Sequence, residues 1–365
     1  MKYGPRRLLA SLLTTTLAFA LQAQSPTFTV SKLSIGGEGG TDYITAEPGT
    51  GRVFVSRQTH FMVIEGATGR VLGDIPDVPG NHGAALAPKA NHGFITDGGD
   101  STVTMFDLKS LKVIKKIAVA VGGMDGITYD ASLDRILLTN HSKPIGTLVA
   151  LDPSSGEISG TTALSNDAPE GAASDGKGRI FVNLEGSNTI EVVDAKSMKV
   201  IADWPIPDCN RPTGLAYDRA SNRIFSGCSK TSVVVDAASG AVVATIANGQ
   251  GVDAIGWDPQ EKLMYIPAGR DGNVTVVHQD DANHYTVIAT VATQTGAKTL
   301  SVDTSTHVAY LFAAEYGPAP AGAAPNGPPG GGPPGGGPPG GGPPGGGPMM
   351  ARGPLIGTGF LAIRH

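Results

Sequence analysis

Four carboxylates, a histidine, a lysine and a threonine occupy one position of a pattern that recurs along the chain. Each precedes a short segment of the type "GITYD" or "GLAYD", and we call them the axial residues: Asp42, His82, Asp125, Glu170, Thr213, Asp253 and Lys298. Carboxylate oxygens are the ligands that Ca²⁺ and Mg²⁺ prefer, and a histidine nitrogen suits Zn²⁺ or Mn²⁺. If the repeat brings these side chains together, it predicts a divalent metal site with these ligands: Asp42, His82, Asp125, Glu170 and Asp253.

Other chemistry is open to the same residues. Carboxylates held close together raise one another's pKa, which could poise one of them as a general base. Lys298 and Arg211 could instead neutralise an acidic ligand. The simplest alternative is that the polar side chains only solvate a water-filled channel and cap backbone groups.

A second polar set recurs where the next strand of each unit ends, namely at Asp97, Asn140, His141, Asn183, Glu185, Arg270 and Glu315. In an antiparallel pair, the end of the second strand lies beside the start of the first. We therefore expect Asn140 and His141 to join the axial residues, with Asn81 and Arg211, in one ligand-binding site. A histidine that only makes surface hydrogen bonds is the alternative for His141.

The segments that position these residues form a repeat. The stretch that begins at Gly214, "GLAYDRASNRIFSGCSKTSVVVDAASGAVVATIANG", contains four alternating apolar runs separated by turn residues. An acid follows the third run of successive units, at spacings of 42, 45, 42 and 42 residues: Glu65, Asp107, Asp152, Asp194 and Asp236. Seven such units predict an all-β, seven-bladed β-propeller with four-stranded antiparallel blades.

The seventh unit is split between the two ends of the chain. Residues 298–315 supply two strands, a Pro/Gly-rich tract follows at 317–353, and "GFLAIRH" resembles a third strand. The segment "FTVSKLSIGG" at 28–37 resembles a fourth, so we expect the N-terminal strand to close the last blade. The predicted domain therefore comprises residues 27–316 and 354–365, with 317–353 as a disordered insertion in blade seven. A Pro-rich recognition segment or spacer is the alternative for the insertion.

Residues 1–23 have the features of a cleavable signal peptide. Lys2, Arg6 and Arg7 precede a short apolar stretch, and Ala23 ends a small-residue cleavage site. The sequence thus predicts a periplasmic or secreted protein with no membrane span, and an uncleaved N-terminus is the alternative. The formal net charge of −5 and the scattered basic residues argue against a nucleic-acid partner. We expect a monomer.

The chain has two cysteines, Cys209 and Cys228. Cys209 precedes the first strand of unit five, and Cys228 ends its second strand, so an antiparallel pair places them side by side. We predict a disulfide, which an oxidising compartment favours. Two free thiols are the alternative, and a zinc site is disfavoured because no second pair of cysteines exists.

The repeats "RIFVNLEGSNTIEVVDAKSMKVIADWPI" and "HGFITDGGDSTVTMFDLKSLKVIKKIAV" resemble the YVTN repeat of the YncE-like, WD-like propellers. The resemblance covers nearly all of the chain after the signal segment and implies an exported seven-bladed propeller. Many members of that family have no established activity. DNA binding has been proposed for one branch, but this chain is acidic.

A neighbouring family, the lactonase-type propellers, resembles the chain more weakly. Its blades often begin with Pro-Arg-His or His-Pro-His, to which only "NRPTGLAYD" and "GNHGAALAP" are similar here, through Arg211 and His82. Gluconolactonase-like propellers hold a divalent ion at the axis with Glu, Asn and Asp.

These observations lead to one main functional hypothesis and two alternatives. We expect a binding or scaffold protein that engages a small molecule or a protein partner at the mouth of the central channel. A metal-dependent lactone hydrolase, with the axial carboxylates as ligands, is the first alternative. An accessory subunit of a periplasmic dehydrogenase is the second.

Overall fold

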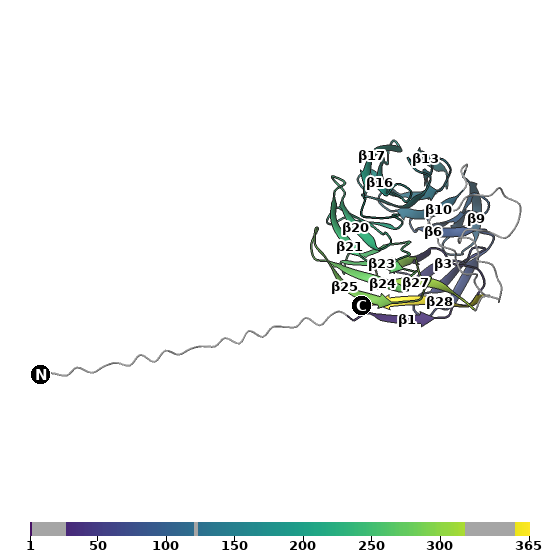
Figure 1. Cartoon of the computed structure of the whole chain (residues 1–365). Coiled ribbons are helices and arrows are strands. Elements are labelled where there is room, and N and C mark those ends of the chain that lie inside the picture. Colours follow the sequence, from purple (N-terminus) through teal and green to yellow (C-terminus); the bar gives the residue numbers. More distant parts are fainter. Residues whose placement is uncertain (2–26, 120–122, 318–354) are drawn as a thin grey trace, which may run out of the picture.

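The computed structural model describes Met1 and residues 27–119, 123–317 and 355–365. These residues form seven separate four-stranded antiparallel sheets (Figure 1). The predicted all-β seven-bladed propeller is therefore confirmed. All but Met1 of the predicted signal peptide (1–23) and all but residue 317 of the predicted insertion (317–353) lie outside the described residues.

The first three blades follow one another along the chain. Blade one consists of β2 (Ile44–Glu47), β3 (Arg52–Ser56), β4 (Phe61–Glu65) and β5 (Val71–Ile75). Blade two consists of β6 (Asn81–Ala87), β7 (His92–Asp97), β8 (Thr102–Asp107) and β9 (Val113–Ala118). Blade three consists of β10 (Met124–Asp130), β11 (Arg135–Asn140), β12 (Thr147–Leu151) and β13 (Ile158–Ala163).

The next three blades repeat the same order. Blade four consists of β14 (Pro169–Ser174), β15 (Arg179–Leu184), β16 (Thr189–Asp194) and β17 (Lys199–Pro205). Blade five consists of β18 (Leu215–Asp218), β19 (Arg223–Ser226), β20 (Thr231–Asp236) and β21 (Val242–Ala247). Blade six consists of β22 (Gly256–Asp258), β23 (Leu263–Ala268), β24 (Asn273–Gln279) and β25 (Tyr285–Ala292).

Blade seven joins the two ends of the chain. Its strands are β26 (Leu300–Asp303), β27 (Val308–Tyr316), β28 (Leu355–Arg364) and β1 (Thr29–Leu33). The outer strand β1 pairs antiparallel with β28, with Thr29 opposite Arg364 and Leu33 opposite Phe360. The predicted closure of the last blade by the N-terminal strand is confirmed.

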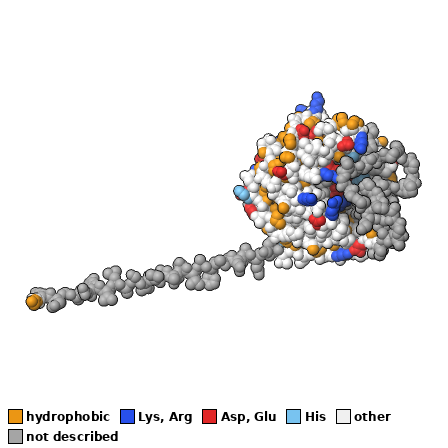
Figure 2. Space-filling model, in the orientation of Figure 1, with side chains coloured by type: hydrophobic (Ala, Val, Ile, Leu, Met, Phe, Trp, Pro, Cys, Tyr) orange, Lys and Arg blue, Asp and Glu red, His pale blue; other side chains and the backbone are white. Residues whose placement is uncertain are grey.

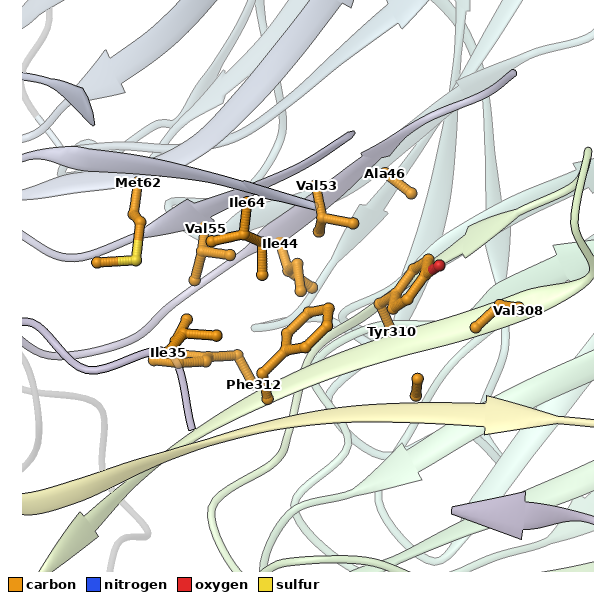
Figure 3. Close-up of a cluster of buried hydrophobic side chains, with 12 residues drawn as sticks. Ile35, Ile44, Ala46, Val53, Val55, Met62, Ile64, Val308, Tyr310 and Phe312 are labelled. Carbon is orange, nitrogen blue, oxygen red and sulfur yellow. The ribbon is translucent and has the colours of Figure 1, made fainter. Parts of the chain in front are cut away.

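The closure is hydrophobic as well as hydrogen-bonded. Buried side chains of blade one, such as Val53 and Ile64, pack against Tyr310 and Phe312 of β27 (Figure 3). Phe360 of β28 belongs to the same cluster and stacks on Tyr310. Blades one and seven therefore share one hydrophobic core.

The recurring acids of the sequence have a structural role. Four aspartates at the ends of the third strands each accept a hydrogen bond from the backbone N–H of the serine three residues later, at 2.7–2.9 Å: Asp107, Asp152, Asp194 and Asp236. A short acidic side chain that bonds the backbone ahead of it stabilises a tight turn. The periodic acid is thus a turn residue.

Arginines tie neighbouring blades together. The arginine that begins the second strand donates from its guanidinium to a backbone carbonyl of the following blade in four cases: Arg52 to Leu108, Arg135 to Ala195, Arg179 to Ala237, and Arg223 to Ala282. The last pair joins blade five to the longer turn between β24 and β25 of blade six. Periodicity alone gave no sign of these contacts.

Glycine follows several axial residues because the first strands approach one another closely. A Cβ added at Gly171 would lie 2.6 Å from the backbone nitrogen of Leu215, and one at Gly214 would lie 2.3 Å from the carbonyl carbon of Ala254. No side chain fits at these distances. The glycine thus lets each first strand pack on the next and places the preceding residue near the ring axis.

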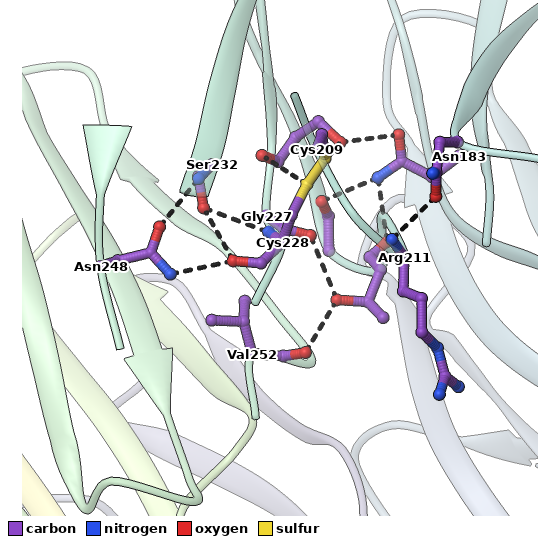
Figure 4. The surroundings of a disulfide bond; sticks show 12 residues. Asn183, Cys209, Arg211, Gly227, Cys228, Ser232, Asn248 and Val252 are labelled. Carbon is purple, nitrogen blue, oxygen red and sulfur yellow. Dashed lines mark hydrogen bonds between the residues drawn. A yellow bond between two sulfur atoms is a disulfide. The ribbon is translucent and has the colours of Figure 1, made fainter. Parts of the chain in front are cut away.

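Cys209 and Cys228 form the predicted disulfide, with Cα atoms 5.4 Å apart (Figure 4). Both side chains are fully buried among residues of blades four and five. The carbonyl oxygen of Cys228 also accepts a hydrogen bond from Asn248 at 2.9 Å. The disulfide therefore joins the segment before β18 to the turn that follows β19, the second strand of blade five.

Figure 2 shows basic and acidic side chains interspersed over the described part of the face in view. The described part of the chain has no helix that could span a membrane.

Candidate functional site

The backbone near several axial residues is held by a polar side chain of the neighbouring blade. Thr96 Oγ1 donates to the carbonyl of Asp125 at 3.0 Å, and Thr299 Oγ1 donates to that of Asp42 at 2.6 Å. The amide of Asn183 donates to the carbonyl of Thr213 at 3.1 Å. Thr96 and Asn183 lie on second strands and Thr299 lies just before a first strand, so these contacts fix the start of each of these first strands against the preceding blade.

Seven of the predicted residues form a continuous series of ionic contacts, which we call the axial cluster: Asp253, Lys298, Asp42, His82, Asp125, His141 and Glu170. They come from blades six, seven, one, two, three and four. Lys298 lies between the first two acids, bonded to Asp253 and 3.3 Å from Asp42 Oδ1. The series thus begins with an ammonium group shared by two carboxylates.

Two histidines continue the series. His82 Nδ1 lies 2.6 Å from Asp42 Oδ2 and 3.9 Å from Asp125 Oδ1. His141 Nε2 lies 3.5 Å from Asp125 Oδ2 and 3.3 Å from Glu170 Oε1. Asp125 therefore stands between the two rings, with one carboxylate oxygen toward each.

The cluster resolves into two groups of potential metal ligands. Asp42, His82 and Asp125 form one, and Asp125, His141 and Glu170 form the other, with the ligand atoms of each group within 4.8 Å of one another. The side chains of Asp42, Asp125 and Glu170 are 17%, 20% and 8% exposed, against 36% and 34% for His82 and His141. The acids thus lie deeper than the histidines, which face solvent.

Asp253, the remaining residue of the predicted metal set, belongs to neither group. Its carboxylate pairs with Lys298, which neutralises it. His141, which the sequence placed in the ligand-binding site but not among the metal ligands, belongs to the second group. The sequence indicated His141 through its position at the end of a second strand, which an antiparallel pair brings near the axial residues.

Two predicted residues, Asn81 and Thr213, hydrogen-bond to nearby groups outside the axial cluster. The buried amide of Asn81 donates to the carbonyls of Val78 and His60 and accepts from Ser56. The buried hydroxyl of Thr213 lies 3.1 Å from the carbonyl of Val252. Both side chains therefore support the backbone.

Arg211 lies apart from the axial cluster, in an ion pair with Glu185 of the second polar set, at 2.5 Å. Its side chain is 42% exposed, so its guanidinium keeps access to solvent. Asn140 is fully buried, and its amide donates to Thr147 at 3.0 Å. Its Oδ1 has no hydrogen-bond partner among the described residues.

In the first half of the cluster, ion pairs determine the pKa values of Asp42 and Lys298. Burial would raise the pKa of Asp42, but the charge of Lys298 and the hydrogen bond with His82 outweigh it and lower that pKa. Burial would lower the pKa of Lys298, but Asp253 and Asp42 raise it well above its usual value. Asp42 therefore stays ionised and Lys298 stays charged.

In the second half of the cluster, formed by Asp125, His141 and Glu170, all three pKa values are raised. Burial and the charge of Asp125 raise the pKa of Glu170 to about 8, despite the opposing effect of His141. Burial would lower the pKa of His141, but the hydrogen bond and charge of Glu170 raise it to about 9. Burial likewise raises the pKa of Asp125. Negative charge crowded around one end of the axis thus attracts protons and would also attract a cation.

Tyr43 is a residue of the site that sequence reasoning missed. Burial raises the pKa of its hydroxyl well above 10, and the charges of Asp125, Glu170, Asp253 and Asp42 raise it further. Its ring lies close to Gly83, where an added Cβ would be 3.5 Å from Cδ2. Tyr43 therefore brings a neutral hydroxyl among the carboxylates. It directly follows Asp42, and that adjacency was the only available signal.

Comparisons with known proteins support the fold. No family model matches the sequence, and no curated protein matches it. A structure titled Kuenenia stuttgartiensis hydrazine synthase is similar, with a TM-score of 0.66 and 16% identity over 80% of this chain and 96% of that chain. One titled mitotic checkpoint complex has a TM-score of 0.68 and 16% identity over 84% of this chain and 95% of that chain.

The WD40 repeats of RRP9 are also similar, with a TM-score of 0.67 and 10% identity over 77% of this chain and 89% of that chain. Identities this low carry information about architecture alone. The chain is a seven-bladed β-propeller.

Proposed function

We propose that this protein is a binding protein whose ligand site is the axial cluster and whose first ligand is a divalent metal ion. One observation carries the proposal: two groups of three residues, each with one histidine and two carboxylates, have their ligand atoms within 4.8 Å of one another. The sites of relatively rigid scaffolds gather such groups from several loops and strand ends.

The donor set selects among metals. Each group offers one imidazole nitrogen and carboxylate oxygens but no sulfur. Imidazole suits Zn²⁺ and carboxylates suit Mn²⁺, whereas Ca²⁺ and Mg²⁺ prefer oxygen ligands alone. We therefore infer Zn²⁺ or Mn²⁺ as the resident ion. Three protein ligands leave coordination positions open for a further ligand, as in zinc sites that bind substrate or water.

We further propose that basic side chains near the cluster bind a second, acidic ligand. Lys298 could contact an acidic group of a small molecule or a protein partner bound at the open positions, and the partly exposed Arg211, outside the cluster, could contact a larger partner. Two of the similar structures are titled hydrazine synthase and mitotic checkpoint complex. A scaffold role at the same face is consistent with both.

Calorimetric titration of chelator-treated protein with Zn²⁺ tests the metal proposal. We expect saturable binding by the wild-type chain and at least tenfold weaker binding by Asp125→Ala, because Asp125 belongs to both groups. Asp281→Asn is the matched control, since Asp281 is an exposed carboxylate paired with His284 away from the axis. Binding that is absent in the wild type, or equal in Asp125→Ala, would contradict the proposal.

We also propose that the chain is exported after cleavage near Ala23 and that it is a YVTN-type propeller. The buried disulfide supports export, because disulfides persist in oxidising compartments. N-terminal sequencing of the protein from a periplasmic or secreted fraction checks this. A mature protein that begins at Met1 and remains in the cytoplasm would refute it.

A further inference from the structure

The two ligand groups are not independent, because both contain Asp125. Its Oδ1 faces His82 Nδ1 at 3.9 Å and its Oδ2 faces His141 Nε2 at 3.5 Å. A carboxylate with one oxygen directed to each of two nitrogen donors has the geometry of a bridging ligand. Two metal ions held about 3.5–4 Å apart in this way form the two-metal sites of many enzymes.

Each half of the cluster has its own terminal ligands. Asp42 lies 2.6 Å from the nitrogen of His82, and Glu170 lies 3.3 Å from that of His141. Each half therefore offers one nitrogen, one carboxylate of its own and one oxygen of Asp125. His141 Nε2 donates to the carbonyl oxygen of Pro169 at 3.0 Å, and an ion bound in that half would replace the proton of this hydrogen bond. Building on the proposed function, we propose that the axial cluster is a dinuclear metal centre bridged by Asp125.

The charge of the cluster fits two ions better than one. Asp42, Asp125 and Glu170 bring three negative charges when ionised, and Asp253 is neutralised by Lys298. One divalent ion would leave a negative charge among three buried carboxylates. Two ions leave a single positive charge, which an anionic ligand at the open positions offsets. The centre thus favours a ligand with an acidic group.

The two halves differ in their neighbours, so their affinities differ. The Lys298 ammonium lies 3.3 Å from Asp42 Oδ1 and repels a cation in the His82 half. Among the described residues, no lysine or arginine forms an ion pair with Glu170 or Asp125. We expect the His141 half to bind first and the His82 half to bind second and more weakly.

Native mass spectrometry and calorimetry of the chelator-treated, full-length mature chain test this with Zn²⁺. The expected result is two ions per chain in two resolved steps. His82→Gln removes only the weaker step, and His141→Gln removes the tighter one. Lys298→Met strengthens the weaker step by about tenfold or more. His284→Gln, which alters an exposed histidine outside the cluster, leaves both steps unchanged.

The bridge itself is tested with Mn²⁺. Electron paramagnetic resonance of protein with two Mn²⁺ per chain should show a magnetically coupled pair, and Asp125→Asn should abolish the coupling. Thermal melting of each variant verifies that the fold persists. One ion per chain, lost equally in His82→Gln and His141→Gln, would replace the dinuclear centre with a mononuclear site and leave the proposed function intact. No bound ion in the wild type would overturn both.

Discussion

Individual side chains in this protein divide between turn formation and the axial cluster. The repeated aspartates at the ends of the third strands bond the backbone of their own turns, whereas the acids near the starts of the first strands contact histidines of neighbouring blades. The pKa values of Asp152 and Asp125, one acid of each kind, are shifted in opposite directions. Turn hydrogen bonds lower the pKa of Asp152, while burial raises that of Asp125.

Asp97 gives a prediction at this scale. Burial raises its pKa to about 7, despite the hydrogen bond from Thr104 and the charge of Lys116, and one carboxylate oxygen has no partner among the described residues. Other groups near it are Asp100 and Thr102. Between pH 4 and 7 the folded chain therefore binds more protons than the unfolded chain, so this residue's contribution to stability falls as pH rises through that window.

Asp97→Asn should remove the loss of folding stability that accompanies ionisation of Asp97. An ionised carboxyl whose pKa rises from 3.8 to about 7 destabilises the fold by at most about 4 kcal/mol, so the variant should be more stable than the wild type above pH 7. The difference should shrink toward pH 4. Urea unfolding at several pH values measures it. Equal dependence of stability on pH in the two proteins would contradict the assignment.

The repeat made part of the site predictable from the sequence, because it fixes which position of each blade lies near the axis. Periodicity located Asp42, His82, Asp125, Glu170 and Lys298, because an equivalent position in each blade reaches the same end of the axis. It could not show that Asn81 and Thr213 turn to backbone partners, because those contacts depend on side-chain conformation. Tyr43 was missed because it lies one position after the aligned residue.

At the scale of the elements, the blades are joined by contacts that recur with the repeat. Arg179 shows the full arrangement, with its Nε 2.8 Å from Asp175, its Nη1 on the carbonyl of Ala237 and its guanidinium over the ring of Phe181. Four strands per unit could be predicted from alternation and turn residues. The arginine contacts could not, since their acceptors are backbone atoms about 60 residues away.

Arg179→Ala should therefore destabilise the protein by about 1–3 kcal/mol. The substitution leaves the buried Asp175 without its cationic partner and removes a contact between blades four and five. Thermal or urea unfolding measures the loss, with Lys177→Ala, an exposed residue of the same turn, as the control. Equal stability of the two variants would show that the contact is incidental.

The disulfide supplies a second prediction at this scale. Its cysteines are 19 residues apart, for which the chain-entropy model gives about 3 kcal/mol of stabilisation. Replacement of both cysteines by serine should lower the midpoint of unfolding, and a reducing agent should do the same to the wild type alone. If a reducing agent also lowers the midpoint of the double variant, the effect does not come from this bond.

At the scale of the whole molecule, the ring depends on a non-local joint. Blade seven takes β26 and β27 from one part of the chain, β28 from the C-terminus and β1 from the N-terminal part. This closure could be predicted because the terminal segments resemble the missing third and fourth strands. Phe360, Leu361, Ala362 and Ile363 are all buried in the two cores flanking blade seven.

Deletion of residues 357–365 should therefore abolish the cooperative unfolding transition of the native protein. It removes a strand paired on both sides and exposes two cores. Deletion of 326–348 is the control and should change the melting temperature little, because Tyr316 and Leu355 are already opposite one another across β27 and β28. An unchanged transition after the first deletion would refute the closure.

The most direct test of the central claim is anomalous X-ray diffraction from crystals of the mature protein grown with Zn²⁺. The account predicts strong anomalous peaks at the ring axis, within bonding distance of His141, Glu170 and Asp125, and a second peak beside His82. Peaks confined to exposed pairs such as His284 and Asp281, with none at the axial cluster, would contradict it.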